Sequence, residues 1–440
     1  MAGGLSARSE DLMSEPLRVA ALQLRAHDRN DFPGTLDDIV RATRSAAATA
    51  DLVVLPEGTL PAYVIGQTPI NAGEIRRAVD VLCVIARETS TVIVIGIAAA
   101  NDERTPSNRA LAIDADGTLA GQADKLFLWH FDRRWFSAGT SVAPVPTAVG
   151  KLGLLVCADG RLPTIARALV DRGACLLVMP TAWVTSGRNP ASLENVQADL
   201  LARVRAYENN VPFVAANKCG VELGMVAYCG KSQIVDANGE VLAVAGQRDA
   251  QTLRATLTLG TPRPHRATLA SPRLSQGSAT RSCRIAISYD SLPPDIDERL
   301  QMLDDDFAIA PNDDARFATI DSAIGAAHVD DAAATDPGGC VPYRLARYPL
   351  LVWRSTLEAP WLERIARARA LELRLYLIVF DDALGRAFAV DPDGTIVAGT
   401  FDGYRIASFV FDPRKTLETT VAPGTDVQAG LERIAAILRH

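Results

Sequence analysis

Short apolar runs alternate with helix-like patterns between residues 17 and 262, and this alternation limits the fold more than any other feature of the chain. The runs are rich in Val, Ile and Leu, as buried strands are, and we expect strands at 17–24, 52–55, 91–98, 175–179 and 211–216. Apolar residues spaced by three and four predict helices at 36–50, 74–90, 163–172 and from residue 190 onward. This order predicts a layered α/β fold with a mixed sheet, in which helices on one face would leave the other face free to stack on a second sheet.

Composition excludes several classes of protein. The chain has 440 residues, enough for two or three domains, and its net charge of -7 without a Lys/Arg-rich block argues against a nucleic-acid partner. No apolar run approaches the ~20 residues of a membrane span. Residues 1–15 are small, polar and acidic and lack the apolar middle of a signal peptide, so we expect a flexible tail and a cytoplasmic protein.

The seven cysteines do not form a disulfide or metal pattern. They are irregularly spaced, no C-x-x-C occurs, and the five histidines do not cluster with them. We therefore expect no metal site and no cofactor. Most of the cysteines have the surroundings of core residues, but Cys157 ends an apolar run and is followed by Asp159-Gly160.

Three reactive residues, Cys157, Glu57 and Lys125, each follow an apolar run or a hairpin. Together they provide what hydrolysis of an amide requires: a nucleophilic thiol, an acid and base that carries protons, and a positive charge for the tetrahedral oxyanion. The backbone N–H of Ala158 is the expected second oxyanion donor. We expect the nearby ammonium and the start of the helix at 163 to lower the pKa of the thiol. Taken singly, each residue would more often be structural; their joint occurrence favours catalysis.

The segments around these residues resemble the nitrilase superfamily of carbon–nitrogen hydrolases. The matching segments appear in the family's order: Pro56-Glu57, Lys125 after a hairpin, Cys157-Ala158-Asp159-Gly160-Arg161-Leu162-Pro163, Pro180-Thr181-Ala182-Trp183, Arg205-Ala206-Tyr207-Glu208-Asn209 and Gly230-Lys231-Ser232. The resemblance covers residues 17–262. It implies an α-β-β-α sandwich, a catalytic triad of Glu57, Lys125 and Cys157, and a homo-oligomer.

Departures from the family pattern concern the substrate. Ala158-Asp159 after the cysteine resembles the amidase and carbamoylase branches rather than true nitrilases. A further Glu that those branches carry after the lysine is absent, and whether Asp132 replaces it stays open. The resemblance suggests substrate-pocket residues at Tyr63, Trp129, Phe131, Asp132, Arg133, Arg134 and Trp183; the aromatic residues could equally pack in the core, and the arginines could be solvated. If Arg133 or Arg134 faces the pocket, it would pair with a substrate carboxylate.

The remaining chain is expected to hold a linker at 263–281 and a second domain at 282–440, after a catalytic domain at 16–262. Residues 283–410 resemble a degenerate copy of the back half of the first domain. In the copy, Ser288 stands in the place of Cys157, and neither Glu57 nor Lys125 has a counterpart. The Asp- and Ala-rich stretch 312–339 is expected to be a mobile loop.

Three functional hypotheses follow. The first is cysteine-dependent hydrolysis, with water and through a thioester, of a C–N bond in a small carboxamide or N-carbamoyl compound. The second keeps the site but hydrolyses nitriles or transfers the acyl group to an amine. The third is a non-catalytic assembly or regulatory protein that retains the fold. A glutaminase joined to a synthetase domain is disfavoured, because the C-terminal half has no Gly-rich pyrophosphate-binding loop.

Overall fold

The computed structural model of the protein describes residues 16–67, 69–100, 105–185, 187, 189, 191–263, 272–275, 277 and 281–439. The expected tail at 1–15 and much of the expected linker at 263–281 lie outside this range. The chain divides into two compact units: unit 1 is Met1–Pro264 with Ile434–His440, and unit 2 is His265–Arg433. Among the helices so described, none combines the length and apolarity needed to cross a membrane.

Unit 1 contains two sheets. The first has the strand order β11 (Val226–Cys229), β10 (Lys218–Glu222), β1 (Leu17–Arg25), β2 (Leu52–Val54), β3 (Val92–Ala99), β4 (Ser107–Ile113) and β5 (Leu119–Asp124), and β14 (Gln251–Leu257) also pairs with β1. The second has the order β13 (Val241–Val244), β12 (Gln233–Val235), β9 (Phe213–Ala216), β8 (Leu176–Pro180), β7 (Gly150–Leu154) and β6 (Val145–Thr147).

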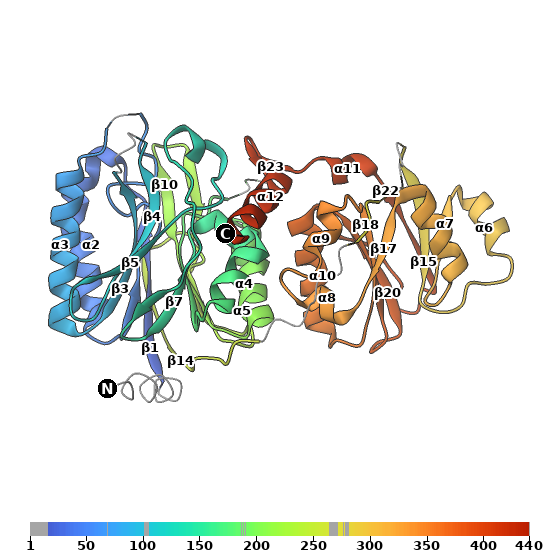
Figure 1. The fold of residues 1–440 in the computed structure, drawn as a ribbon, viewed down its shortest axis with the longest axis horizontal. Coiled ribbons are helices and arrows are strands. Elements are labelled where there is room, and N and C mark those ends of the chain that lie inside the picture. Colours follow the sequence, from blue (N-terminus) through green and yellow to red (C-terminus); the bar gives the residue numbers. More distant parts are fainter. Residues whose placement is uncertain are drawn as a thin grey trace. The chain divides into compact units, whose positions relative to one another are not determined.

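Two helix pairs cover the outer faces of these sheets (Figure 1). Helices α2 (Phe32–Ala47) and α3 (Ala72–Thr89) pack on the first sheet, and α4 (Pro163–Asp171) and α5 (Ala202–Asn209) pack on the second. Strands β1, β2 and β3 contact β8 and β9, so the inner faces of the sheets meet each other. The predicted α-β-β-α sandwich is therefore confirmed for unit 1.

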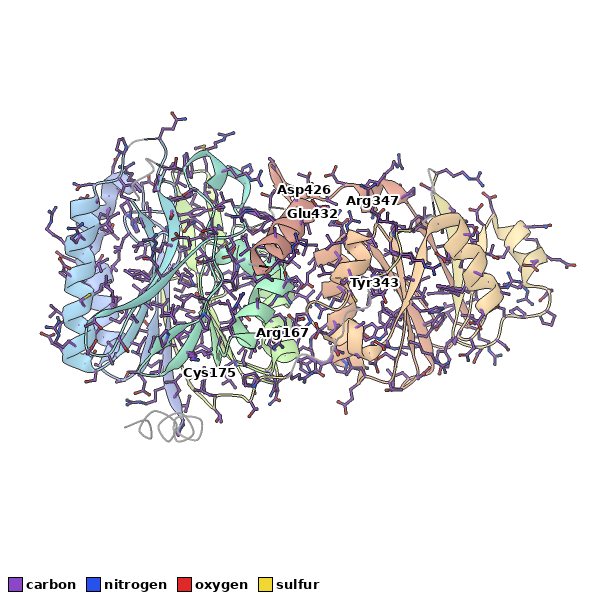
Figure 2. All side chains as sticks on the ribbon, in the orientation of Figure 1. Arg167, Cys175, Tyr343, Arg347, Asp426 and Glu432 are labelled. Atoms are coloured by element: carbon purple, nitrogen blue, oxygen red, sulfur yellow. The ribbon has the colours of Figure 1, made fainter. Side chains whose placement is uncertain are left out.

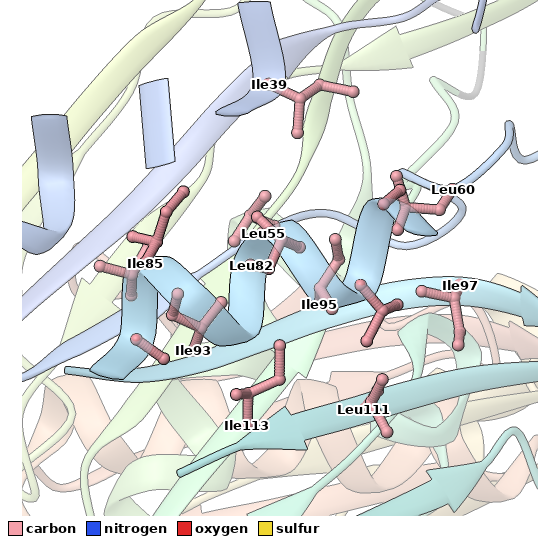
Figure 3. Packing of buried hydrophobic residues seen from close by; sticks show 14 of the residues in the cluster. Ile39, Leu55, Leu60, Leu82, Ile85, Ile93, Ile95, Ile97, Leu111 and Ile113 are labelled. Atoms are coloured by element: carbon pink, nitrogen blue, oxygen red, sulfur yellow. The ribbon is translucent and has the colours of Figure 1, made fainter. Parts of the chain in front are cut away.

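The core between α3 and the first sheet shows why these segments fold as they do (Figure 3). All eight residues of β3 are buried, and Ile93, Ile95 and Ile97 face Leu82 and Ile85 of α3. Burying one such side chain stabilises the fold by about 1.5–3 kcal/mol. Helix α3 begins where the Asn71 side chain accepts a hydrogen bond from the Glu74 N–H, at 3.1 Å. The packing holds β2 and β3 in place, and the site begins at the end of β2.

Gly96 of β3 lets the chain that follows β2 pass close to the sheet. A Cβ atom at this position would lie 2.3 Å from the Cα atom of Glu57 and 2.5 Å from the carbonyl oxygen of Pro56. The N–H of Gly96 donates to that same carbonyl at 3.1 Å, and the N–H of Thr59 donates to the carbonyl of Gly96 at 2.8 Å. A glycine is required because only its bare backbone leaves room for Glu57.

Sequence periodicity found most elements of unit 1 but missed several strands. The helix expected from residue 190 begins only near 197, where a π-helical turn at Gln197–Leu201 leads into α5. Strands β6, β10, β11 and β14 were not expected as separate elements. On α4, Arg167, labelled in Figure 2, forms an ion pair with Asp171.

Unit 2 also contains two larger sheets. One has the order β16 (Phe307–Ile309), β15 (Cys283–Ser288) and β22 (Ile406–Phe411). The other has the order β17 (Ala326–Val329), β18 (Leu350–Ser355), β19 (Tyr376–Asp381), β20 (Arg386–Val390) and β21 (Ile396–Gly399). The helices are α6 (Ile296–Leu303), α7 (Asp314–Ile324), α8 (Asp331–Thr335), α9 (Val341–Leu345), α10 (Ala359–Leu373) and α11 (Pro413–Leu417), and β23 (Thr420–Ala422) pairs with β24 (Thr425–Asp426). Helix α12 (Val427–Leu438) begins in unit 2, and its residues from Ile434 onward belong to unit 1.

Two expectations for unit 2 were wrong. The stretch 312–339 is not a loop, because it contains α7, β17 and α8; Asp313 and Asp330 cap the two helices, and the alanines favour helix. The match of Ser288 to Cys157 also fails. Cys157 follows β7, which lies two strands from β9, whereas Ser288 ends β15, which pairs with β16 and β22 in the smaller sheet.

Candidate active site

Three strand ends from both sheets of unit 1 deliver the predicted catalytic residues. Glu57 follows β2, Lys125 follows β5, and Cys157 follows β7 of the other sheet. The N–H of Glu57 donates to the carbonyl oxygen of Thr181 at 3.3 Å, which joins the two sheets at this point. Residues that are far apart in sequence therefore meet where the sheets stack.

A fully buried ion cluster forms the centre of the site. The Nζ atom of Lys125 lies 2.8 Å from Oε1 of Glu57 and 2.5 Å from Oδ2 of Asp132, and none of these side chains is exposed. Burial alone would lower the pKa of Lys125, but the carboxylates of Asp132 and Glu57 raise it well above its ordinary value. Lys125 is therefore a fixed ammonium, and with two of its three N–H donors directed at carboxylates, one remains for another acceptor.

The two carboxylate oxygens of Glu57 have different surroundings. Oε1 accepts hydrogen bonds from Lys125 at 2.8 Å and from Nδ2 of Asn108 at 2.6 Å. Oε2 is buried and has no hydrogen-bond partner among the described residues. The carbonyl oxygen of Asn108 also accepts from the N–H of Lys125 at 2.8 Å, so one residue of β4 holds both members of the pair. Oε2 is left as the oxygen that can exchange a proton.

Cys157 occupies a sharp turn. Its φ angle is 47°, a left-handed conformation that is uncommon outside glycine, and it begins a short 3-10 helix at Cys157–Arg161. The side chain is 5% exposed. Burial, with a smaller contribution from the Glu57 carboxylate, raises the pKa of the thiol well above its usual range, although the Lys125 ammonium opposes this. The expected lowering of this pKa was wrong, because burial outweighs the positive charge.

Asp159 connects the backbone that follows Lys125 with the backbone that precedes Cys157. Its Oδ1 atom accepts from the N–H groups of Leu126 at 2.9 Å and Phe127 at 2.7 Å, and its Oδ2 atom accepts from Val156 at 3.0 Å. Burial raises the pKa of Asp159 to about 7, against these N–H donors, which lower it. The carboxyl group is enclosed on both oxygens, so we assign it to positioning.

A second buried pair supports the turn that follows Cys157. Arg205 of α5 forms an ion pair with Glu208, and neither side chain is exposed. The Nε atom of Arg205 also donates to the carbonyl oxygen of Gly160 at 3.0 Å. The Arg-Ala-x-Glu segment seen in the sequence therefore stabilises the backbone of the turn that carries Cys157.

The predicted pocket residues divide into two groups. Tyr63, Asp132 and Trp183 are buried, Tyr63 donates to Oδ1 of Asp132 at 2.8 Å, and the ring of Phe131 packs on that of Tyr63 with centroids 5.6 Å apart. In contrast, Trp129 is partly exposed beneath the guanidinium of Arg161, 4.7 Å from its ring centroid. The two remaining candidates, Arg133 and Arg134, are exposed. The structure thus places Asp132 and Tyr63 against Lys125, with Phe131 packed on Tyr63, and leaves the two arginines exposed.

Sequence reasoning missed Asn108 and the Lys218–Glu222 pair as parts of this region. Nζ of Lys218 lies 3.2 Å from Oε2 of Glu222, which also accepts from the Tyr228 hydroxyl at 2.7 Å, and all three side chains are buried. Oε1 of Glu222 accepts from the N–H of Val64 at 2.6 Å, next to Tyr63. The i,i+4 spacing of Lys218 and Glu222 was a visible signal; Asn108 gave none.

Comparison with known protein families identifies the class to which the chain belongs. Residues 18–267 match the family described as carbon-nitrogen hydrolase, which covers more than half of the chain. The chain therefore belongs to the carbon–nitrogen hydrolase family, within the nitrilase superfamily, and the predicted family is confirmed. It is an enzyme of the carbon–nitrogen hydrolase class.

Individual relatives match the same half of the chain. A protein of Pseudomonas protegens named "Hydrolase in pqqF 5'region" is 34% identical over 225 residues, covering 50% of this chain and 76% of its own length. The omega-amidase NIT2 of Homo sapiens is 30% identical over 248 residues, covering 53% and 86%. A solved structure of an active-site variant of the amidase from Nesterenkonia sp. AN1 in complex with butyramide is 27% identical, with a TM-score of 0.50, covering 55% and 91%.

Proposed function

We propose that the protein hydrolyses the C–N bond of a small carboxamide or N-carbamoyl compound through a thioester on Cys157. Oε2 of Glu57 takes the thiol proton as the sulfur attacks the carbonyl carbon, and the oxyanion is stabilised by the remaining Lys125 donor and the Ala158 N–H. Glu57 then gives the proton to departing ammonia or amine. In the second half, Glu57 accepts a proton from the water that attacks the thioester carbonyl, and it returns this proton to the Cys157 sulfur as the C–S bond breaks, which releases the acid and restores the thiol and the Glu57 carboxylate.

The observation that carries this proposal is the arrangement of the buried Glu57 carboxylate. One oxygen is held by Lys125 and Asn108, and the other has no partner among the described residues, yet Glu57 is close enough to Cys157 to act on the thiol pKa. Because that pKa is raised, the resting thiol is protonated and requires a base as it attacks. Relatives whose names describe amidases support the amide over other C–N substrates.

An experiment with amide, N-carbamoyl and nitrile panels tests the proposal. We expect ammonia release from an amide or N-carbamoyl compound, loss of turnover in Cys157→Ala, and an acyl adduct on the Cys157 peptide by mass spectrometry. Cys175→Ala is the matched control and should retain turnover, since Cys175 directly precedes β8 and its thiol donates to the Lys151 carbonyl. Turnover by Cys157→Ala at the normal rate would exclude the thioester route.

We further propose that unit 2 is a reduced, non-catalytic copy of this fold. The proposal is supported by strand order: β17, β18 and β19 run parallel and β20 and β21 follow antiparallel, as do β7, β8, β9, β12 and β13. Superposition of experimental structures of the two units, each taken alone, would test it; failure of the two five-strand segments to superpose would refute it.

A further inference from the structure

The charges around Cys157 bear on the acyl group that the site accepts. Two carboxylates, Glu57 and Asp132, surround one ammonium, that of Lys125, in a cluster with no exposure to solvent. The cluster therefore has no surplus positive charge to offer a substrate carboxylate. A further carboxylate in this region would be desolvated beside negative charge, which is costly.

The other cations near the site are also engaged or solvated. Lys218 is buried and paired with Glu222 at 3.2 Å, and Arg161 lies over the ring of Trp129. Arg133 and Arg134 are exposed to water. Among the described residues near Cys157, every buried cation is therefore already paired with a carboxylate of the protein.

A group of mainly apolar side chains, here called the apolar wall, lies beside the sulfur. Tyr63, Ala182 and Tyr228 form a buried cluster, and partly buried side chains of Phe131, Val184 and Val226 pack against it. The backbone amide of Ala182 is close enough to the thiol to act on it, so the wall begins at the nucleophile. The accessible parts of Phe131, Val184 and Val226 favour contact with an apolar group, by about 25 cal/mol for each Å² removed from water.

We propose that the site is specific for amides or N-carbamoyl compounds whose non-reacting part is uncharged and apolar, and that it discriminates against substrates with a carboxylate in that part. This rests on the proposed function. Under this proposal, Arg133 and Arg134 do not bind a substrate carboxylate, because both residues are exposed to solvent.

Two pairs of substrates, whose members differ in one terminal group, test the proposal on the full-length protein. Succinamate is butyramide with the terminal methyl replaced by a carboxylate, and N-carbamoyl-β-alanine bears the same relation to propylurea. We expect kcat/KM for the uncharged member of the accepted pair to exceed that of the anion at least tenfold. The double variant Arg133→Ala/Arg134→Ala should keep this ratio, and Phe131→Arg should reduce it by adding a cation to the wall.

The outcomes separate this proposal from the proposed function. A wild-type enzyme that turns over succinamate or N-carbamoyl-β-alanine as well as the uncharged partner overturns the specificity and leaves the hydrolase activity standing. The same holds if the double arginine variant selectively loses the anionic substrate. If no member of either pair forms an acyl adduct on Cys157 or releases ammonia, the proposed function fails first and the specificity with it.

Discussion

Units 1 and 2 share a structural device but differ in chemistry. In unit 1, Arg205 pairs with Glu208 and donates through Nε to the carbonyl of Gly160 at 3.0 Å. In unit 2, Arg369 pairs with Glu372 at 2.9 Å and donates through Nε to the carbonyl of Ala334, also at 2.9 Å. In each unit the carbonyl lies just past the end of the first parallel strand of the five-strand segment, so the same ion pair supports the same turn.

The reactive positions differ. The residue three before Gly160 is Cys157, and the residue three before Ala334 is Asp331, which accepts a hydrogen bond from the indole N–H of Trp353 at 2.8 Å. Strand β2 is followed by Leu55-Pro56-Glu57, and β16 is followed by Ala310-Pro311-Asn312. At equivalent positions, the thiol of Cys157 in unit 1 is therefore replaced by the acid Asp331 in unit 2, and the acid Glu57 is replaced by the amide Asn312. Framework residues and reactive residues can therefore be tested separately, one unit against the other.

The largest expected difference comes from the residue that ends the second strand in each unit. Glu57→Gln removes the proton carrier, and kcat should fall about 10²–10⁴-fold, the usual contribution of general acid–base catalysis. Asn312→Ala should leave kcat within about twofold, because Asn312 only accepts from Arg354 in unit 2 and is exposed. Steady-state kinetics on both purified variants checks this. A comparable loss in Asn312→Ala would show that unit 2 takes part in turnover.

The next largest effect concerns the shared ion pair. Arg205→Met and Arg369→Met each remove the cation of a buried Arg–Glu ion pair, which should cost about 3–5 kcal/mol of stability in the affected unit. Urea unfolding followed by tryptophan fluorescence measures this, and Arg18→Met, which breaks an exposed pair with Asp51, should change stability by less than about 1 kcal/mol.

Activity sharpens this second comparison. Arg205→Met should also lower kcat, because the Gly160 carbonyl and the turn that carries Cys157 lose their support. Arg369→Met should leave kcat per folded molecule unchanged. If neither arginine variant loses stability, the pairs do not anchor the turns.

The sequence pointed to Glu57, Lys125 and Cys157 because each follows a locally recognisable element: an apolar strand before Glu57 and Cys157, and a hairpin before Lys125. The thiol pKa was mispredicted because burial is a tertiary quantity that no nearby residue type reveals. Asn108 was missed because its partner is set by the pairing of β3 with β4 and β4 with β5, which aligns Arg109 with Asp124 and so brings Asn108 beside Lys125. Composition misled at 312–339, where Asp and Ala form capped helices and not a loop.

A smaller effect is expected from Asn108→Ala. A hydrogen bond to a charged group contributes about 1.5–3 kcal/mol, so freeing Oε1 of Glu57 from this donor should lower kcat roughly 10–100-fold with little change in KM. Asn238→Ala, in an exposed turn of the same unit, is the control and should behave as the wild type. If Asn108→Ala also lowers thermal stability, and its kcat returns to the wild-type value at lower temperature, then Asn108 has only a structural role.

The smallest and most discriminating effect concerns two buried thiols, one in each unit. Burial raises the pKa of Cys340 in unit 2 to about 12, and burial together with Glu57 raises that of Cys157. Removing the negative charge in Glu57→Gln should therefore lower the pKa of Cys157 while leaving that of Cys340 unchanged. Thiolate absorbance near 240 nm as a function of pH, with Cys157→Ala and Cys340→Ala as the respective blanks, measures both.

The sign of that shift separates two ways of activating the sulfur. If Cys157 attacked as a preformed thiolate, Glu57→Gln would enrich the reactive form and thioester formation would persist at neutral pH. If the neutral thiol passes its proton to Glu57 as it attacks, the variant should hold more thiolate than the wild type and yet form the acyl adduct far more slowly. Faster acylation in Glu57→Gln would contradict the role of Glu57 as base. The only effect of the negative charge of Glu57 would then be to raise the pKa of the Cys157 thiol.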